Sequence, residues 1–453
     1  MTERGRDVNV MKGPPPQQTH KSELFSVEPY ISADYARREA DALWAKVWQM
    51  ACRLEELQKV GDYVTYDIID QSIIVVRTAP DRIQAFYNVC MHRGRRLTEG
   101  CGQAKVFHCR FHGWQWNLDG SSQRTFLGED WGGALTPENL KLSEIKVDSW
   151  GGYVFINMDP DCEPLRDYLE PAASLLDPFE IERMRFRWRK WLIMPCNWKV
   201  ALEAFDESYH TFGTHPQLLQ YSDVDTWSQA QGKHGHHGMI LEGMRAPGEG
   251  SHHVFPEPRK DYLTAMAESA WMMLETLDAF LSHSMVHALQ RVPAELPPET
   301  PAFEAYGKAQ QWAREMDAAK GVKWPEVTPE QAIAAGYDWH IFPNMVILQA
   351  PTFLLGYRAR PNGYDPDSCI FEVYVLDRAP EGVEPPQPPN ERCDDLTNEK
   401  FWGRILMQDF NNMEQVQRGV KQKGFPGIRP NPIKEQAVAN FHRTLARYMG
   451  GDG

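Results

Sequence analysis

The chain has 453 residues, of which 42% are hydrophobic, so it is long enough for two to three globular domains with sizeable cores. Its 48 Lys and Arg residues against 62 acidic residues give a net charge of −14, which argues against nucleic acid as a general partner. No apolar run reaches the roughly 18 to 20 residues that span a bilayer, and residues 1–20 lack the hydrophobic core of a signal peptide. We therefore expect a cytoplasmic protein without a membrane partner.

The chain begins with a polar arm, residues 1–22, whose prolines indicate an extended segment of unreadable function. Apolar residues then recur four, three and four positions apart, which predicts an amphipathic helix that begins at Ser32. These residues are Ala36, Ala40, Leu43 and Val47. We assign residues 1–44 to an arm and helix that pack with the last domain.

From Asp62 the sequence changes to short β-branched and aromatic runs separated by turn residues. The run continues to the turn-rich segment that begins at Asp159. We predict a compact antiparallel β domain at residues 45–160.

Two Cys-His pairs lie on glycine-bearing loops of this domain. Cys90 and His92 are two positions apart, and Cys109 and His112 are three positions apart. Two thiolates and two imidazoles can hold a zinc ion, or a Rieske [2Fe-2S] centre in which the histidines bind one iron and the cysteines the other. The spacing favours the Rieske centre and leaves a zinc knuckle as the alternative.

The rest of the chain, residues 161–453, mixes strands and helices. Strand patterns occur at about 186–193, 345–358 and 369–376, and helical patterns lie between them. A proline-rich segment at 292–301 indicates an insertion or a lid. The whole chain is therefore expected to be α+β.

Two groups of histidines in this region invite a metal interpretation. They are His234, His236 and His237, and then His252 and His253. Neither group has an acidic residue or a cysteine at ligand spacing along the chain, so we interpret both as polar turns or a pocket edge. No Gly-x-Gly-x-x-Gly loop for a dinucleotide is present, so electrons must come from another protein.

A second set of candidate ligands follows in a stretch that resembles one helix from Asn197. The helix is predicted to run to His210, and Glu203, Glu207 and His210 would share one face of it at positions i, i+4 and i+7. His215 lies five positions further on, about 140° away on an ideal helix, but Gly213 can loosen the turn and let the two imidazoles converge.

The last predicted helix, at about 397–421, supplies a third ligand. Asp409 lies within an apolar stripe, and a buried carboxylate needs a cation, either a metal or the arginine of a salt bridge. Two histidines and one carboxylate form the facial triad of iron(II) enzymes that activate O2. The stripe consists of Trp402, Leu406, Asp409, Met413 and Val416.

These motifs resemble one known family. Cys-x-His-Arg-Gly followed by Cys-x-x-His-Gly-Trp resembles the Rieske motif of ring-hydroxylating, non-haem iron oxygenases. Glu-x-x-His-x-x-x-x-His with a late Asp-x-x-x-Met resembles the catalytic domain of their α subunits. The resemblance covers the chain from about residue 25 and implies an all-β Rieske domain plus a catalytic domain of the helix-grip type.

The resemblance also assigns cofactors to residues. The ligands of the [2Fe-2S] cluster would be Cys90, His92, Cys109 and His112. The ligands of a mononuclear Fe(II) would be His210, His215 and Asp409.

The function that the resemblance implies is that of a terminal oxygenase component with O2 as cosubstrate. NAD(P)H would supply electrons only through a separate reductase, with or without a ferredoxin. A homotrimer is implied, with or without a β subunit, in which electrons cross between subunits through His112 and Glu207. Asp206 is the alternative bridge. The rival classes are a plain Rieske electron-transfer protein and a zinc-stabilised binding module.

Candidates for a substrate pocket are apolar residues near the ligand helices or on the returning strands. We expect a small apolar substrate, aromatic or polycyclic, that is hydroxylated once or twice in aromatic hydrocarbon catabolism. O- or N-demethylation is the alternative. The candidates are Phe205, Phe212, Met239, Leu241, Val286, Ile347, Leu348, Phe353 and Leu355.

Overall fold

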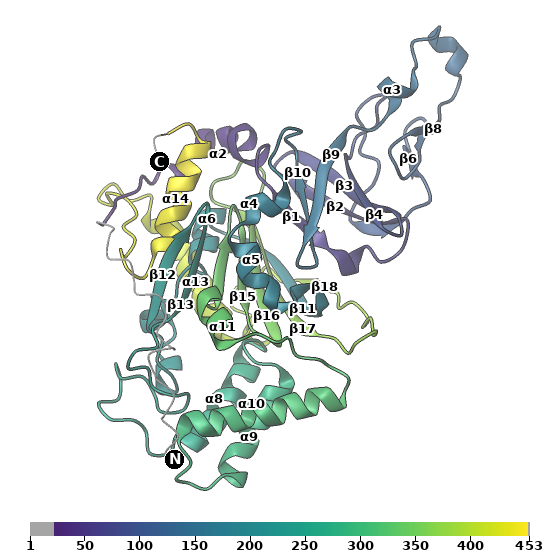
Figure 1. Ribbon diagram of the computed structural model, residues 1–453. Helices are drawn as coiled ribbons and strands as arrows, with labels where there is room; N and C mark the ends of the chain where they lie inside the picture. Colours follow the sequence, from purple (N-terminus) through teal and green to yellow (C-terminus); the bar gives the residue numbers. More distant parts are fainter. Residues whose placement is uncertain (1–21, 452–453) are drawn as a thin grey trace.

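The computed structural model describes residues 22–451, so the proline-bearing arm up to residue 21 lies outside the described part. Figure 1 shows a β domain beside a larger sheet, with a helical subdomain beyond that sheet. Among the described residues, no helix is both long and apolar enough to cross a bilayer.

The helix expected at Ser32 is present. The Ser32 hydroxyl caps it by accepting a backbone N–H three residues on, and the helix runs as α2 (Ala33–Glu39). A π-helical turn over Ala40–Trp44 continues it. The last residue of this turn packs edge-on against Trp198 of the catalytic domain, with the ring centroids 5.1 Å apart.

The β domain is built on one antiparallel sheet in the order β1-β10-β9-β4-β3-β2-β5. Its strands are β1 (Gln49–Arg53), β2 (Asp62–Ile68), β3 (Gln71–Ala79), β4 (Arg82–Tyr87), β5 (Cys101–Gln103), β9 (Glu144–Trp150) and β10 (Tyr153–Asn157). A small sheet of β6 (Phe107–His108), β7 (Gln115–Trp116) and β8 (Ser122–Arg124) projects from one end (Figure 1). The predicted antiparallel β domain is confirmed.

The second domain holds an eight-stranded sheet in the order β12-β13-β14-β15-β16-β17-β11-β18, antiparallel except between β11 and β18. Its strands are β11 (Met184–Met194), β12 (Thr226–Gln231), β13 (His234–Met239), β14 (Asp338–Ile341), β15 (Met345–Gln349), β16 (Phe353–Pro361), β17 (Cys369–Arg378) and β18 (Asn390–Arg392). The strands expected near 186, 345 and 369 are all present.

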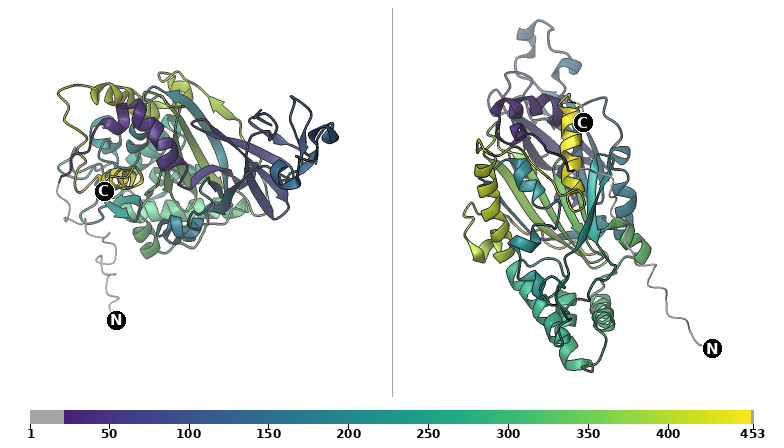
Figure 2. Two further views of the ribbon diagram at one scale, coloured as in Figure 1. Left: turned by 90° about the horizontal axis from the view of Figure 1, so that it is seen from above. Right: turned by 90° about the vertical axis from the view of Figure 1, so that its left-hand side faces the viewer.

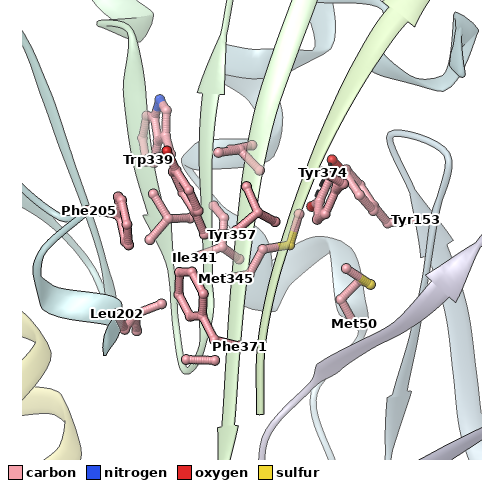
Figure 3. Close-up of a cluster of buried hydrophobic side chains, with 14 of the residues drawn as sticks. Met50, Tyr153, Leu202, Phe205, Trp339, Ile341, Met345, Tyr357, Phe371 and Tyr374 are labelled. Carbon is pink, nitrogen blue, oxygen red and sulfur yellow. Dashed lines mark hydrogen bonds between the residues drawn. The ribbon is translucent and has the colours of Figure 1, made fainter. Parts of the chain in front are cut away.

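One face of this sheet carries the helices with the candidate ligands. Register places Asp338, Leu348 and Leu355 opposite one another, so they share a face. On this face Phe205 stacks on Tyr357, with the ring centroids 3.8 Å apart (Figure 3). The main helices are α6 (Trp198–Glu203), α7 (Thr211–Thr214), α12 (Glu399–Trp402), α13 (Arg404–Gly419) and α14 (Gln436–Tyr448).

The opposite face carries the β domain. Arg358 donates from Nη1 to the carbonyl of Met50 at 2.6 Å, and Tyr374 lies against Tyr153. Figure 3 shows Tyr374, Tyr153 and Met50 together, on the far side of the strands from Phe205. The eight-stranded sheet therefore separates the β domain of the chain from its candidate iron ligands.

A helical subdomain is inserted between β13 and β14. It consists of α8 (Tyr262–Thr276), α9 (His283–Glu295) and α10 (Ala302–Ala319), which enclose a core of their own. Figure 2 shows it at the opposite end of the molecule from the β6–β8 sheet. The proline-rich 292–301 segment ends α9 and connects it to α10, so it belongs to this subdomain.

The helix predicted from Asn197 to His210 is wrong beyond Glu203, where α6 ends. Glu203 accepts the hydroxyl of Tyr30 at 2.7 Å, so it does not share a face with the later residues. The Glu207 carboxylate accepts the backbone N–H of His210 at 2.9 Å, and this local bond replaces helical pairing.

The C-terminal helix is also divided. Gly403 separates α12 from α13 with φ at +76°, and a Cβ there would lie 2.1 Å from the carbonyl of Thr276. Val416 is 46% exposed and lies outside the buried stripe. The buried residues of α13 are Ile405, Leu406, Asp409, Phe410, Met413 and Gln417.

The contact between the two domains is sensitive to one buried ion pair. Arg358 binds Glu372 through two hydrogen bonds of 2.6 and 2.7 Å. Arg358→Met should lower the free energy of unfolding by about 3–5 kcal/mol, because Glu372 is left as a buried charge beside Arg360 alone. Urea unfolding followed by tryptophan fluorescence measures this loss, and Arg358→Met/Glu372→Leu should recover most of it.

The ion pair between Arg358 and Glu372 also predicts that the stability of the protein falls at acid pH. Burial raises the pKa of Glu372, but Arg358 and Arg360 outweigh it and lower the pKa to about 2, below the ordinary 4.5. The stabilisation is complete above about pH 4.5 and is lost as the pH falls toward 2. Acidification from pH 5 to pH 3 should therefore lower the Tm of the wild type more than that of the Arg358→Met/Glu372→Leu variant. Equal shifts in Tm would contradict this account.

Candidate functional site

His210, His215 and Asp409 converge on one point. His210 and His215 flank α7, and Asp409 lies in the middle of α13. Nε2 of His215 is 2.8 Å from Oδ1 of Asp409, and Nε2 of His210 is 3.7 Å from the same oxygen. One atom from each residue lies within 4.8 Å of the other two, as the ligands of a single metal ion do.

Nδ1 of each histidine ring already forms a hydrogen bond. Nδ1 of His210 lies 2.8 Å from Oε1 of Glu207, and Nδ1 of His215 lies 2.9 Å from Oε1 of Gln408. Since each Nδ1–H donates to an oxygen, each Nε2 keeps its lone pair toward Asp409. Oδ1 of Asp409 is buried without a hydrogen-bond donor. Three lone pairs that face one another fit a divalent iron ion.

The surroundings of His210 also favour a cation. Burial lowers the pKa of His210, but the hydrogen bond and charge of Glu207, together with Asp409, outweigh it and raise the pKa to about 9 when no metal is bound. In that state a proton on Nε2 takes the place of the metal, and a bound ion would displace it. Gln408 was not a predicted site residue. Nothing in its sequence context marks it except that it precedes Asp409.

The two cluster loops share one backbone pattern. In each loop the cysteine N–H donates to the carbonyl five residues on at 2.8 Å, and the glycine four residues on donates back to the cysteine carbonyl at 3.0 Å. Gly94 and Gly113 both have positive φ, at +74° and +77°. The two loops therefore differ mainly in where each places its histidine.

The four side chains of the loops fit a Rieske cluster. Cys90 and Cys109 are 3% and 1% exposed, and burial raises the pKa of the Cys90 thiol. The rings of His92 and His112 lie 4.5 Å apart, and Nδ1 of His92 is buried without a hydrogen-bond partner. Trp114 stacks on His92 at 4.8 Å, whereas His112 is exposed.

The two candidate bridging carboxylates point in different directions. Glu207 contacts the ring and the backbone N–H of the candidate ligand His210. The Asp206 carboxylate is fully buried and faces the sheet, with Oδ2 3.8 Å from Nδ1 of His340. Of the two carboxylates, only Glu207 forms hydrogen bonds with His210.

A buried polar cluster beside the triad was not predicted. It joins Asp206 to Asp338 and His340 of β14, which project from the same face of the sheet. Both oxygens of Asp206, Oδ1 of Asp338 and Nδ1 of His340 are buried and have no hydrogen-bond partner. Burial raises the pKa of both carboxyl groups well above the usual range, and nearby carboxylates raise it further.

The edge of this cluster is tightly bonded. The Tyr337 hydroxyl lies 2.6 Å from Oγ of Ser208, which lies 3.0 Å from Nε2 of His237. Nε2 of His237 is also 3.5 Å from Oδ2 of Asp338. His237 is therefore held by hydrogen bonds. The interpretation of His234, His236 and His237 as a polar turn or pocket edge was wrong, because all three lie buried on strand β13.

An aromatic wall connects the polar cluster to the triad. Tyr357 stacks on Phe205 at 3.8 Å, and Phe371 lies 5.4 Å from Phe205. Burial, followed by the charges of Asp409 and Asp338, raises the pKa of Tyr357. Tyr357 therefore lies close enough to both carboxylates for their charges to act on it.

The structure divides the predicted pocket residues. Phe205, Leu348, Phe353 and Leu355 lie on the face of the sheet that carries the triad. Ile347 projects from the opposite face, because it alternates with Leu348.

The remaining pocket candidates lie elsewhere. Val286 packs in the core of the helical subdomain, away from the sheet. Met239 and Leu241 line a separate pocket of about 280 Å³ beside Tyr337. Phe212 lies edge-on against His253, 4.9 Å away.

His252 and His253 have the acidic companions that the sequence did not show. His253 lies 2.7 Å from Asp225, and His252 lies 2.9 Å from Asp223. These carboxylates are almost thirty positions earlier, and the fold brings them together. The reason for setting aside a metal interpretation at this pair was therefore wrong.

The hydrogen bond from His215 to Gln408 predicts a selective loss of iron. Gln408→Leu should weaken the mononuclear site about 10- to 100-fold, because the ring of His215 loses its orienting acceptor. Asp409→Ala should remove that iron completely. Metal analysis should then give two irons per chain instead of three, with an unchanged visible spectrum of the cluster. Three irons in Asp409→Ala would contradict this ligand set.

Comparison with known proteins agrees with this geometry. Residues 179–451 match the model of the ring hydroxylating alpha subunit (catalytic domain), and residues 47–126 match that of the Rieske [2Fe-2S] domain. The chain is 33% identical over 201 residues to the carnitine monooxygenase oxygenase subunit of Acinetobacter pittii (strain PHEA-2), which is 44% of this chain and 54% of that protein. It is 34% identical over 206 residues to the glycine betaine monooxygenase oxygenase subunit of Chromohalobacter salexigens. That match covers 44% of this chain and 45% of that protein. The match thus spans about half the length of these relatives.

Solved structures share the fold over nearly the whole chain. The quaternary ammonium Rieske monooxygenase CntA in complex with L-carnitine has a TM-score of 0.63 at 22% identity, covering 95% of this chain and 97% of that chain. Naphthalene 1,2-dioxygenase with indole bound has a TM-score of 0.62 at 19% identity. This match covers 95% of this chain and 93% of that chain. The catalytic-domain model covers more than half of the chain, and the chain therefore belongs to the family of ring-hydroxylating oxygenase α subunits.

Proposed function

We propose that this chain is the oxygenase component of a Rieske monooxygenase that hydroxylates a small quaternary ammonium compound at a carbon next to its nitrogen. One observation carries the substrate class. Asp206 and Asp338 lie buried beside the triad, and neither forms a salt bridge with a lysine or arginine among the described residues.

A cationic substrate would resolve the cost of this arrangement. A buried carboxyl group without a cationic partner is costly, and burial raises the pKa of both groups well above the usual range because it disfavours their charged forms. An organic cation between them would favour the ionised forms and replace the missing partner.

The aromatic wall supports the same class. A quaternary ammonium group has no N–H to donate, so proteins bind it through the faces of aromatic rings together with carboxylate charge. Phe205 and Tyr357 supply the rings, and Asp338 supplies the charge. The relatives named above act on carnitine and on glycine betaine, which contain such a group.

The expectation of an aromatic substrate finds less support. An apolar ring would leave Asp206 and Asp338 without a partner. The likeness to naphthalene 1,2-dioxygenase extends to the fold alone. The alternative from the sequence, demethylation at nitrogen, is the closer one, since hydroxylation of an N-methyl carbon gives an unstable carbinol that releases the methyl group as an aldehyde.

We further propose that Cys90, His92, Cys109 and His112 hold the cluster and that His210, His215 and Asp409 hold Fe(II). When bound, the two centres supply single-electron transfer and O2 activation. The protein shields Asp409 from water and fixes each imidazole through its Nδ1–H.

The electron route proposed here runs between two copies of the chain. Within one chain the catalytic sheet separates the Rieske domain from the triad, and the β6–β8 end projects away from that sheet (Figure 1). Exposed apolar side chains surround the cluster loops and would be covered in a homotrimer. They are Met91, Phe111, Phe126, Leu127 and Trp131. Glu207 would then join His210 to His112 of a neighbouring copy.

The proposed substrate class predicts a charge preference. The wild type should oxidise carnitine, glycine betaine or choline, and it should leave 3,3-dimethylbutanol, the neutral carbon isostere of choline, almost untouched. Asp338→Asn should raise KM for the cation on the order of 10-fold or more, because it removes the charge. O2 uptake and mass spectrometry of products would measure both. Equal rates on the cation and its isostere, or oxidation of indole alone, would refute the class.

The proposed role of Glu207 as the bridge predicts that its loss slows electron transfer from the cluster to the iron site. Glu207→Gln should keep both metal centres and slow reoxidation of the reduced cluster by orders of magnitude, because the variant loses the charge that holds two imidazoles together. Single-turnover mixing at saturating substrate would follow the cluster spectrum. Asp206→Asn tests the alternative bridge, and because Asp206 is also proposed to face the substrate cation, its reoxidation is compared only at saturating substrate. A stall in Asp206→Asn but not in Glu207→Gln would assign the bridge to Asp206.

A further inference from the structure

A second group of two histidines and one carboxylate lies near the surface beside α7. It consists of Asp225, which precedes β12, and of His252 and His253 on the loop after β13. One atom from each lies within 4.8 Å of the other two, as in the triad. These residues are separate from the iron ligands, and the family motifs do not include them.

The distances within this group resemble those of the triad. Nε2 of His253 lies 2.7 Å from Oδ2 of Asp225, and Nε2 of His252 lies 3.4 Å from the same oxygen. The two Nε2 atoms of the triad lie 2.8 and 3.7 Å from Oδ1 of Asp409. In both places one carboxylate oxygen faces two imidazole nitrogens.

A buried carboxylate orients the first histidine. Asp223 accepts Nδ1–H of His252 at 2.9 Å, and it also accepts the backbone N–H groups of His252 and Arg245. Nε2 of His252 therefore keeps its lone pair and directs it at an ionised oxygen. Two acceptors that face each other are unfavourable unless a cation lies between them.

The charges around the group leave room for that cation. Lys434 binds Asp225 through Oδ1 at 2.9 Å and leaves Oδ2 to the histidines. The carboxylates of Asp223 and Asp225 thus lie against the two imidazoles, with one ammonium group, that of Lys434, bound to Asp225.

We propose that Asp225, His252 and His253 bind one Zn²⁺ ion per chain, with Asp223 orienting His252. Zinc fits because it accepts two imidazoles and a carboxylate, with water in an open fourth position. The histidines are 48% and 40% exposed, so the ion could enter from solvent. Magnesium and calcium prefer oxygen ligands alone.

The position gives such an ion a role in the fold. The zinc would tie the loop that carries His252 and His253 to the segment before β12. His253 lies edge-on against Phe212 of α7, 4.9 Å away, and α7 lies between the two histidines of the triad. The ion would therefore hold the loop against the helix that positions the iron ligands.

The test uses the full-length, iron-loaded protein dialysed against excess Zn²⁺. Metal analysis should give one zinc per chain while all three irons remain. Absorption at the zinc K-edge, which iron does not disturb, should show two imidazoles and an oxygen ligand near 2.0–2.1 Å.

Matched variants locate the ion. The double variant His252→Asn/His253→Asn should bind zinc more than about 100-fold more weakly than the wild type. Loss of an orienting partner alone lowers metal affinity about 10- to 100-fold, and this variant loses two ligands. Asp223→Asn should show that smaller loss. His287→Asn, an exposed histidine of α9, should bind zinc like the wild type. No bound zinc, zinc gained in exchange for iron, or unchanged binding in the double variant would each overturn the proposal.

Discussion

The fold of the catalytic domain depends on bringing together groups that repel one another. Oδ1 of Asp409 and the Nε2 atoms of His210 and His215 all carry lone pairs, and they converge in a buried place. Hydrogen bonds to Glu207 and Gln408 fix the rings with those lone pairs inward. Such a site costs folding free energy until a cation binds, so the apolar packing of α6 and α13 against the sheet must offset that cost.

Much of this could be predicted from sequence, because ligand chemistry is local. The cluster loops are two short segments in which cysteine, histidine and glycine lie within five residues of one another. The strands were predictable for the same reason, since β-branched runs such as 369–376 are continuous. Asp409 was found because an acidic residue within an apolar stripe is conspicuous in a helix of regular period.

What could not be predicted depends on long-range contacts. The helix from Asn197 ends early because Glu203 bonds to Tyr30 and Glu207 bonds to His210, and periodicity shows neither contact. Asp206 follows α6 and Asp338 lies on β14, so the two meet only because the fold packs the segment after α6 against the sheet. That packing changes the inferred substrate from an apolar ring to a cation, so the pocket was the least predictable part of the site.

The shared backbone of the two cluster loops has a consequence for direction. Because the loops have the same hydrogen bonds, the histidine offset of one residue is the main difference between them, and both histidines would bind the same iron. His92 is covered by Trp114, whereas His112 lies open to solvent beside Phe111. One imidazole of the cluster site is therefore covered by its own domain, and the other is accessible to a partner. Placing the histidine three residues after the cysteine, and not two, thus decides which of the two histidine ligands another molecule can contact.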